Sequence, residues 1–155
     1  MSRPAPRQRT VLATGALLVS LAGCSSAVQV DAAPEGADPI CAAVFQALPD
    51  EVAGGERRET TSQGSSAWGQ PPVVLSCGVE VAGPTSNPCQ VVEAPDGTSV
   101  DWVVSEPEGG RVVWTTYGRT PAVELSMPDD ADVTAAAPLD VAEAVAVIEQ
   151  QRACT

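Results

Sequence analysis

The chain has 155 residues, of which 44% are hydrophobic but only 3% aromatic, and its formal net charge is −12. All eight basic residues are arginines, there is no lysine and no histidine, and twenty residues are acidic. So acidic a protein is repelled by phosphate backbones, which argues against nucleic acid as a partner. The missing histidine excludes nucleophilic catalysis of the Ser-His-Asp or Cys-His type.

Residues 1–23 are predicted to be a lipoprotein signal peptide. They begin with three arginines, continue with an apolar stretch over 11–21, and end in small residues directly before Cys24. The stretch is too short to span a bilayer stably, and the thiol of Cys24 is the nucleophile that would accept a diacylglyceryl group before cleavage. We therefore expect an acylated Cys24 that holds the mature protein in the bilayer, on the extracytoplasmic face of the cell membrane. An uncleaved signal anchor or a cytosolic amphipathic start is the alternative.

Cleavage before Cys24 would leave five arginines and twenty acidic residues, a formal net charge of −15. A domain this acidic is repelled by anionic headgroups and should stand off the membrane. Residues 24–37, the acylated cysteine and a small, polar segment with Pro and Gly, are predicted to be a flexible tether. The remaining residues, 38–155, fit a single domain with one core.

The domain is expected to open with a helix, because Asp38 can cap it, Pro39 suits its first position, and Pro49 stops it. Residues 50–67 are charged and then rich in Ser and Gly, so we expect mostly loop, with at most one strand around 57–61. Strands are predicted at 73–79, 89–93, 100–105, 111–117 and 122–127, with turn signals between them.

A final helix is predicted from the capping-box pair Asp140 and Glu143 and from an apolar stripe that includes Val141, Val145 and Ile148. The expected order is a helix, about five mostly antiparallel strands, and a C-terminal helix. This is an α+β fold in a single small disulfide-bonded domain, and both helices could cover one face of the sheet.

Four cysteines, Cys41, Cys77, Cys89 and Cys154, remain besides Cys24. An even number in an oxidising compartment predicts two disulfides, with three possible pairings. We favour Cys77 with Cys89, which closes a short excursion between two strands, and Cys41 with Cys154, which joins the first helix to the last. Free buried thiols are the alternative, and a zinc site is disfavoured because there is no C-x-x-C spacing and no histidine.

Acidic residues offer one candidate metal site. Asp129, Asp130 and Asp132 could supply hard oxygen ligands for calcium, but they lack the spacing, the Gly and the Glu of an EF-hand loop. A solvated loop is the preferred interpretation. We expect no metal and no cofactor.

The few aromatic residues lie on or beside the predicted strands. Trp114 and Tyr117 fall on opposite faces of one strand, so at least one of them should point away from a one-sided core. With the following Arg119, they are predicted to form a contact for an unidentified envelope protein or a glycan. Packing in the core or at the sheet edge is the alternative for each ring.

Several stretches of this chain resemble a family of uncharacterised secreted lipoproteins of actinobacteria, which carries only a domain-of-unknown-function label. The most specific stretch is Trp114-Thr115-Thr116-Tyr117-Gly118-Arg119 with Pro121-Ala122-Val123; the others are Cys41-Ala42-Ala43 with Ala47-Leu48-Pro49, Trp68-Gly69 with Pro71-Pro72-Val73-Val74-Leu75 and Cys77-Gly78, and Val100-Asp101-Trp102. The resemblance implies localisation and ancestry, and it brings no activity and no catalytic residues.

These observations predict a membrane-anchored, non-enzymatic interaction or binding module of the cell envelope. Two alternatives come from other classes. A small-ligand or lipid carrier would need an apolar cavity, which is hard to build from mostly Ala and Val. A carboxylate-based, cell-wall-active enzyme would need a cleft in which carboxylates of raised pKa converge.

Overall fold

The computed structural model describes residues 26–83 and 85–155. The predicted signal peptide and the predicted lipidation site, Cys24, lie outside these residues. Within the described ranges, no helix is both long enough and apolar enough to cross a membrane.

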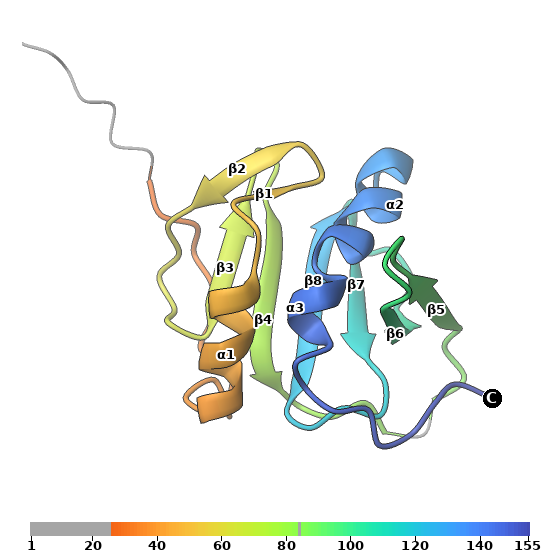
Figure 1. Cartoon of the computed structure of the whole chain (residues 1–155). Helices are drawn as coiled ribbons and strands as arrows, with labels where there is room; N and C mark the ends of the chain where they lie inside the picture. The colour runs from red at the N-terminus through yellow and green to blue at the C-terminus, as the bar shows by residue number, and fades with distance from the viewer. Residues whose placement is uncertain (1–25, 84) are drawn as a thin grey trace, which may run out of the picture.

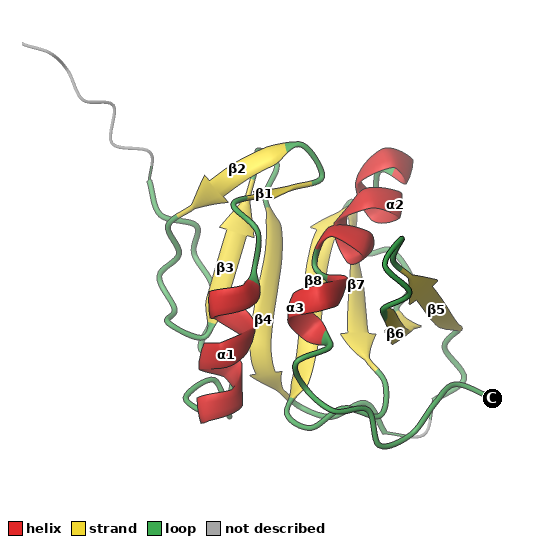
Figure 2. Cartoon of the chain, viewed as in Figure 1, coloured by secondary structure: helices red, strands yellow, loops and turns green. Residues whose placement is uncertain are grey.

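Eight strands form one sheet in which every neighbouring pair is antiparallel (Figure 1). The spatial order is β1-β2-β3-β4-β8-β7-β6-β5, so β4 and β8 meet at the centre. Three short helices lie on one face of this sheet (Figure 2). The strands are β1 (Glu51–Val52), β2 (Gly55–Arg58), β3 (Ser65–Trp68), β4 (Val73–Val79), β5 (Cys89–Glu93), β6 (Ser99–Val104), β7 (Arg111–Thr116) and β8 (Ala122–Pro128), and the helices are α1 (Pro39–Ala47), α2 (Ala131–Asp140) and α3 (Ala142–Val145).

The expected α+β arrangement of about five strands and one C-terminal helix is therefore wrong. The five strands expected between residues 73 and 127 are present as β4 to β8, but β1, β2 and β3 extend the sheet beyond them. The strands β2 and β3 read Gly-Glu-Arg-Arg and Ser-Ser-Ala-Trp, which is not the alternating apolar pattern that predicts a strand. Pairing with a neighbouring strand, rather than an apolar repeat, defines them.

The end of the chain also differs from the prediction, because two helices replace one. Asp130 caps α2 by accepting hydrogen bonds from the backbone N–H groups of Asp132 (3.0 Å) and Val133 (3.2 Å). The acidic run considered for calcium is thus a helix start. Asp140, expected to begin the final helix, ends α2 and accepts a hydrogen bond from the backbone N–H of Ala53 (2.8 Å).

The first helix follows from local chemistry. The side chain of Asp38 accepts a hydrogen bond from the backbone N–H of Ile40 (2.9 Å), and Pro39 occupies the first turn. At the other end, Leu48 adopts an extended conformation before Pro49, as residues before proline prefer. Cys41 and Val44 of this helix are fully buried against the sheet.

The helix-covered side of the sheet, here called the inner face, holds the core. Alternate residues of each central strand point to this face, so Leu75, Leu125 and Met127 are fully buried. Trp102 and Trp114 pack on it with ring centroids 6.2 Å apart. Burial of large side chains removes most apolar area from water, so we assign most of the folding free energy to this face.

Two disulfides are present, as the cysteine count predicts, but the predicted pairing is wrong. The observed bonds join Cys41 to Cys77 (Cα to Cα 5.6 Å) and Cys89 to Cys154 (6.0 Å). Cys77 points to the inner face, where α1 brings Cys41 against it. Three strands separate β4 from β5, a distance of about 19 Å at the usual strand spacing, so Cys77 cannot reach Cys89.

A strap, residues 28–36, crosses the other side of the sheet, here called the open face. The backbone of Val28 bonds to Glu59 (2.8 Å) and Thr61 (3.0 Å), and the N–H of Glu35 bonds to the carbonyl of Gly78 (2.9 Å). Gly78 has φ of 84°, and a Cβ at this position would collide with the backbone of Glu35. The composition predicts a flexible tether here, but these hydrogen bonds attach the segment to the domain from Val28 onward.

Candidate binding groove

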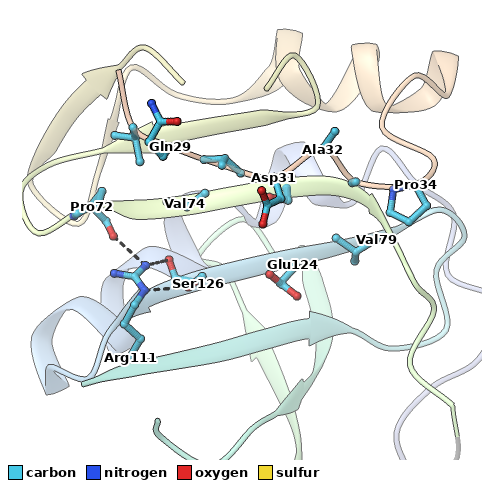
Figure 3. A pocket seen from close by; sticks show the side chains of 14 residues that line it. Gln29, Asp31, Ala32, Pro34, Pro72, Val74, Val79, Arg111, Glu124 and Ser126 are labelled. Atoms are coloured by element: carbon cyan, nitrogen blue, oxygen red, sulfur yellow. Dashed lines mark hydrogen bonds between the residues drawn. The ribbon is translucent and has the colours of Figure 1, made fainter. Parts of the chain in front are cut away.

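A groove of about 480 Å³ lies between the strap and the open face of β4, β8 and β7 (Figure 3). Its volume falls in the range of pockets that bind small molecules. Apolar walls come from both sides, and a few polar groups lie among them. The residues on which the argument depends are Asp31 of the strap, Val74 and Ser76 of β4, Arg111 of β7, and Glu124 and Ser126 of β8.

Strand register brings these side chains together. Glu124 of β8 pairs with Ser76 of β4 on one side and with Thr115 of β7 on the other. Ser126 follows two positions later, where it pairs with Val74. Because residues two apart on a strand share a face, the polar groups of three neighbouring strands lie in one patch of the open face.

Arg111 occupies one end of the groove and is held by uncharged oxygens. Its Nε donates to the hydroxyl of Ser126 (3.0 Å), and its Nη2 donates to the carbonyls of Ser126 (2.8 Å) and Pro72 (3.0 Å), as Figure 3 shows. Burial lowers the pKa of this guanidinium, which stays charged at any physiological pH. The arginine therefore ties β7 across β8 to the start of β4.

Glu124 lies further along the groove and is half-buried. Desolvation raises the pKa of its carboxyl above the ordinary value of 4.5, and no hydrogen bond or neighbouring charge in the described structure offsets that shift. An ionised carboxylate that loses water without gaining a partner is destabilised. Such a group in a cleft is a candidate for ligand binding or catalysis.

Asp31 approaches the same space from the opposite wall. It belongs to the strap and is exposed, and its carboxylate points toward the sheet in Figure 3. The buried Ser76, which pairs with Glu124 in the register of β4 and β8, adds a further hydroxyl to the groove lining. The groove thus offers two carboxylates from different elements, the hydroxyls of Ser76 and Ser126, and an arginine at one end.

The predicted partner contact of Trp114, Tyr117 and Arg119 does not form one surface. Trp114 is only 7% exposed and packs in the core. Tyr117 is half-buried, and the guanidinium of Arg152 lies 5.8 Å from its ring centroid. Of the three residues, only Tyr117 keeps part of its side chain in solvent.

Arg119 is a structural residue rather than an exposed contact, since it is 4% exposed. Its guanidinium donates to the backbone carbonyls of Ile148 and Ser99 (3.1 Å to the latter), and to the side-chain oxygen of Gln150 (3.3 Å). Burial lowers its pKa, and the negative charge of Asp101 opposes that effect. An arginine that follows a strand with aromatic residues is typical of an exposed contact surface. Here the C-terminal segment folds back over Arg119 and buries its side chain.

Sequence reasoning did not find the groove because its residues come from four separate segments. Arg111 and Glu124 sit at strand positions that predict only a solvated face. One local signal was available in the strap, where Val28 and Val30 alternate with Gln29 and Asp31 as in a short strand. That alternation indicates a segment with one packed side, and the backbone bridge between Val28 and Thr60 agrees with it.

Among the residues that the structure describes, no group of three or more His, Cys, Asp or Glu side chains is placed to hold a metal ion. Comparison with curated proteins and with solved structures gives no match to this chain. A family model described as "Protein of unknown function (DUF3515)" matches residues 9–154, nearly the full length. The chain therefore belongs to this family, and the expected membership in a family of unknown function is confirmed.

Proposed function

We propose that this protein is a lipid-anchored, extracytoplasmic binding module, and that the groove under the strap is its ligand site. The observation that carries the proposal is Glu124, a desolvated carboxylate that faces an open groove without a partner. A bound group that supplied the missing countercharge would relieve this cost. Binding therefore accounts for an arrangement that costs the free protein stability.

The anchoring part of the proposal rests on the sequence before the described residues. The three arginines, the short apolar stretch and the small residues before Cys24 together form a lipoprotein signal. With Cys24 acylated, the protein acts at the outer surface of the cell membrane.

Substitution of the thiol tests the anchor. Cys24→Ala should block lipid transfer and normal cleavage, so any variant molecule that has nevertheless lost its signal peptide should partition into the aqueous phase of Triton X-114. Metabolic labelling with a palmitate analogue should mark the wild type and leave the variant unlabelled. A Cys24→Ala protein that still enters the detergent phase after signal removal would show that another segment anchors it.

The binding part is tested by site-specific crosslinking in intact cells. A photoreactive amino acid is placed at Gln29 or at Ala32, which are both exposed on the strap. The two positions should crosslink to the same ligand and should therefore give adducts of equal added mass. The matched control is Glu143, which is exposed on α3 over the inner face. Equal adduct formation from Glu143 would contradict a ligand site in the groove. The absence of adducts from both strap positions would contradict it as well.

A second candidate function follows from the two carboxylates. Asp31 and Glu124 line the same groove, and hydrolysis of a glycosidic bond uses a pair of acids of which one has a raised pKa. We rank it second because Asp31 is exposed, whereas catalytic carboxylates of this kind are held in defined environments. Release of soluble sugars from purified cell wall, lost in both Asp31→Asn and Glu124→Gln, would favour the enzyme over the binding module.

A further inference from the structure

The two charged ends of the groove do not neutralise each other. Arg111 pairs with Pro128 in the register of β7 and β8, whereas Glu124 pairs with Thr115, four residues along β7. At the usual rise per residue, the backbones at these positions are about 13 Å apart. The Arg111 guanidinium reaches Ser126, two residues from Glu124 on β8, but its donors are directed at Ser126 and Pro72 and not at the Glu124 carboxylate.

The region around Glu124 is consequently an acceptor site with an aliphatic approach. The carboxylates of Glu124 and Asp31 are potential hydrogen-bond acceptors that line the groove from the sheet and from the strap. Ser76, the partner of Glu124 in the register of β4 and β8, contributes a hydroxyl to the same lining. Val30 and Ala32 of the strap and Val79 at the end of β4 provide apolar surface beside them. A ligand that fits needs a cation at its tip and a methylene chain behind it.

The chemistry favours an ammonium group over a guanidinium. An ammonium is a compact charge with three donors that point in different directions, which suits acceptors on different walls. A guanidinium presents its donors in one plane and fits best against a single carboxylate that accepts two parallel bonds. Glu124 and Asp31 belong to two separate elements, so they do not form such a planar pair.

The composition of this protein excludes a second copy of itself as the source of that group. The chain contains no lysine, and its mature form would carry a net charge of −15, so two copies repel each other. A basic partner is attracted by the same charge. Electrostatic complementarity therefore points to a different extracytoplasmic protein or peptide that is rich in lysine.

Resting on the proposed function of the groove, we infer that its ligand is a lysine side chain of a basic extracytoplasmic partner, with the ammonium group placed between Glu124 and Asp31. The stem of that side chain would lie along Val30 and Val79, and Ser76 would accept its third hydrogen bond. Arg111 would border the site without contacting the ammonium.

The test uses the full-length protein in neutral detergent micelles and three small probes. These are the Nα-acetyl methylamides of lysine, of norleucine, which has the same stem without the charge, and of arginine. Chemical-shift titration at low ionic strength should detect the lysine probe with changes at groove residues, and weaker binding of the other two. Equal binding of norleucine, or stronger binding of arginine, would overturn the inference.

Matched variants locate the site. Glu124→Gln should weaken binding of the lysine probe about tenfold or more, because a charge-assisted bond is replaced by a neutral one. Glu93→Gln, an exposed glutamate on β5, should leave binding unchanged. Thermal melting of both variants confirms that they fold. An unchanged affinity in folded Glu124→Gln would refute the ammonium site, while strap crosslinks to a partner in cells would still support the groove as a ligand site of other chemistry.

Discussion

The inner and open faces of the sheet are built from the same strands but differ in packing: the inner face forms the core, and the open face lines the groove. On β7, Trp114 points to the helices and packs in the core, whereas its neighbour Thr115 points to the open face, next to Glu124. Helices and a buried disulfide cover the inner face, while a single strap crosses part of the open face. The pleat of the sheet thus separates the side chains that stabilise the core from those that line the groove. Substitutions at adjacent positions should therefore have very different effects.

The largest expected effect comes from the two disulfides, which lie in contrasting environments. Loop-closure entropy for sequence separations of 36 and 65 predicts about 4 kcal/mol from each bond. Cys41 and Cys77 are fully buried, so replacing both by Ala also removes core contacts, and we expect a total loss of about 5 kcal/mol. The pair Cys89→Ala and Cys154→Ala should cost about 4 kcal/mol or less, because Cys89 is exposed.

Urea denaturation of the two double variants measures this order, and a larger loss from the Cys89–Cys154 pair would reverse the assignment of stability to the inner face. Limited reduction under native conditions gives an independent check. Alkylation and peptide mapping should find Cys89 and Cys154 modified first, since a buried bond is less accessible to thiolate.

A smaller effect should separate neighbours on one strand. Trp114→Ala leaves a cavity in the core and should lower the free energy of unfolding by about 3 to 5 kcal/mol. Thr115→Ala, on the open face, should change it by about 0.5 kcal/mol or less. Thermal and urea unfolding of both variants measures the difference. Similar losses would mean that the open face is packed as tightly as the inner one.

The smallest effect concerns the charge of Glu124. Because its pKa is higher in the folded than in the unfolded state, the folded state binds more protons between the two values, and stability falls as pH rises through that window. Above the folded pKa the penalty is fully present. Glu124→Gln should therefore be more stable than the wild type at pH 7. The expected gain is about 0.5 kcal/mol, the usual upper size of the effect of a surface substitution.

Below the ordinary carboxyl value of 4.5, this advantage of Glu124→Gln should disappear, because both states of the wild type then carry the proton. Urea titrations at a series of pH values follow the difference. Glu93→Gln serves as the exposed control. A Glu124→Gln protein that is less stable at neutral pH would show that the carboxylate has a stabilising partner.

The sequence predicts best those features that local chemistry decides. Asp38 and Pro39 begin α1, and the strands with clear apolar runs, such as β4 and β8, have nearly their expected bounds. Asp130 caps α2, although the acidic run around it predicts a solvated loop. The short polar strand β3 gave no periodic signal, because its serines are buried by neighbouring segments and not by hydrophobicity.

The disulfide pairing and the groove could not be predicted, because both depend on strand order. Sequence proximity favoured Cys77 with Cys89, but β8, β7 and β6 lie between their strands. Arg119 follows the same logic: its neighbours along the chain indicate a surface, and the segment that buries it returns about thirty residues later, at Ile148 and Gln150. Local sequence patterns do not predict contacts between segments that are far apart along the chain.

The attachment of the strap determines how far the domain can move from its proposed anchor. Among the described residues, Val28 is the first whose backbone is hydrogen-bonded to the backbone of the domain, and it stands four positions after Cys24. Fully extended, that length spans about 14 Å at most. The groove borders the strap itself, so in an acylated protein the groove would stay within a thin layer above the bilayer. For a partner confined to the same layer, the effective concentration is high, and a weak, rapidly reversible contact with a single side chain would suffice.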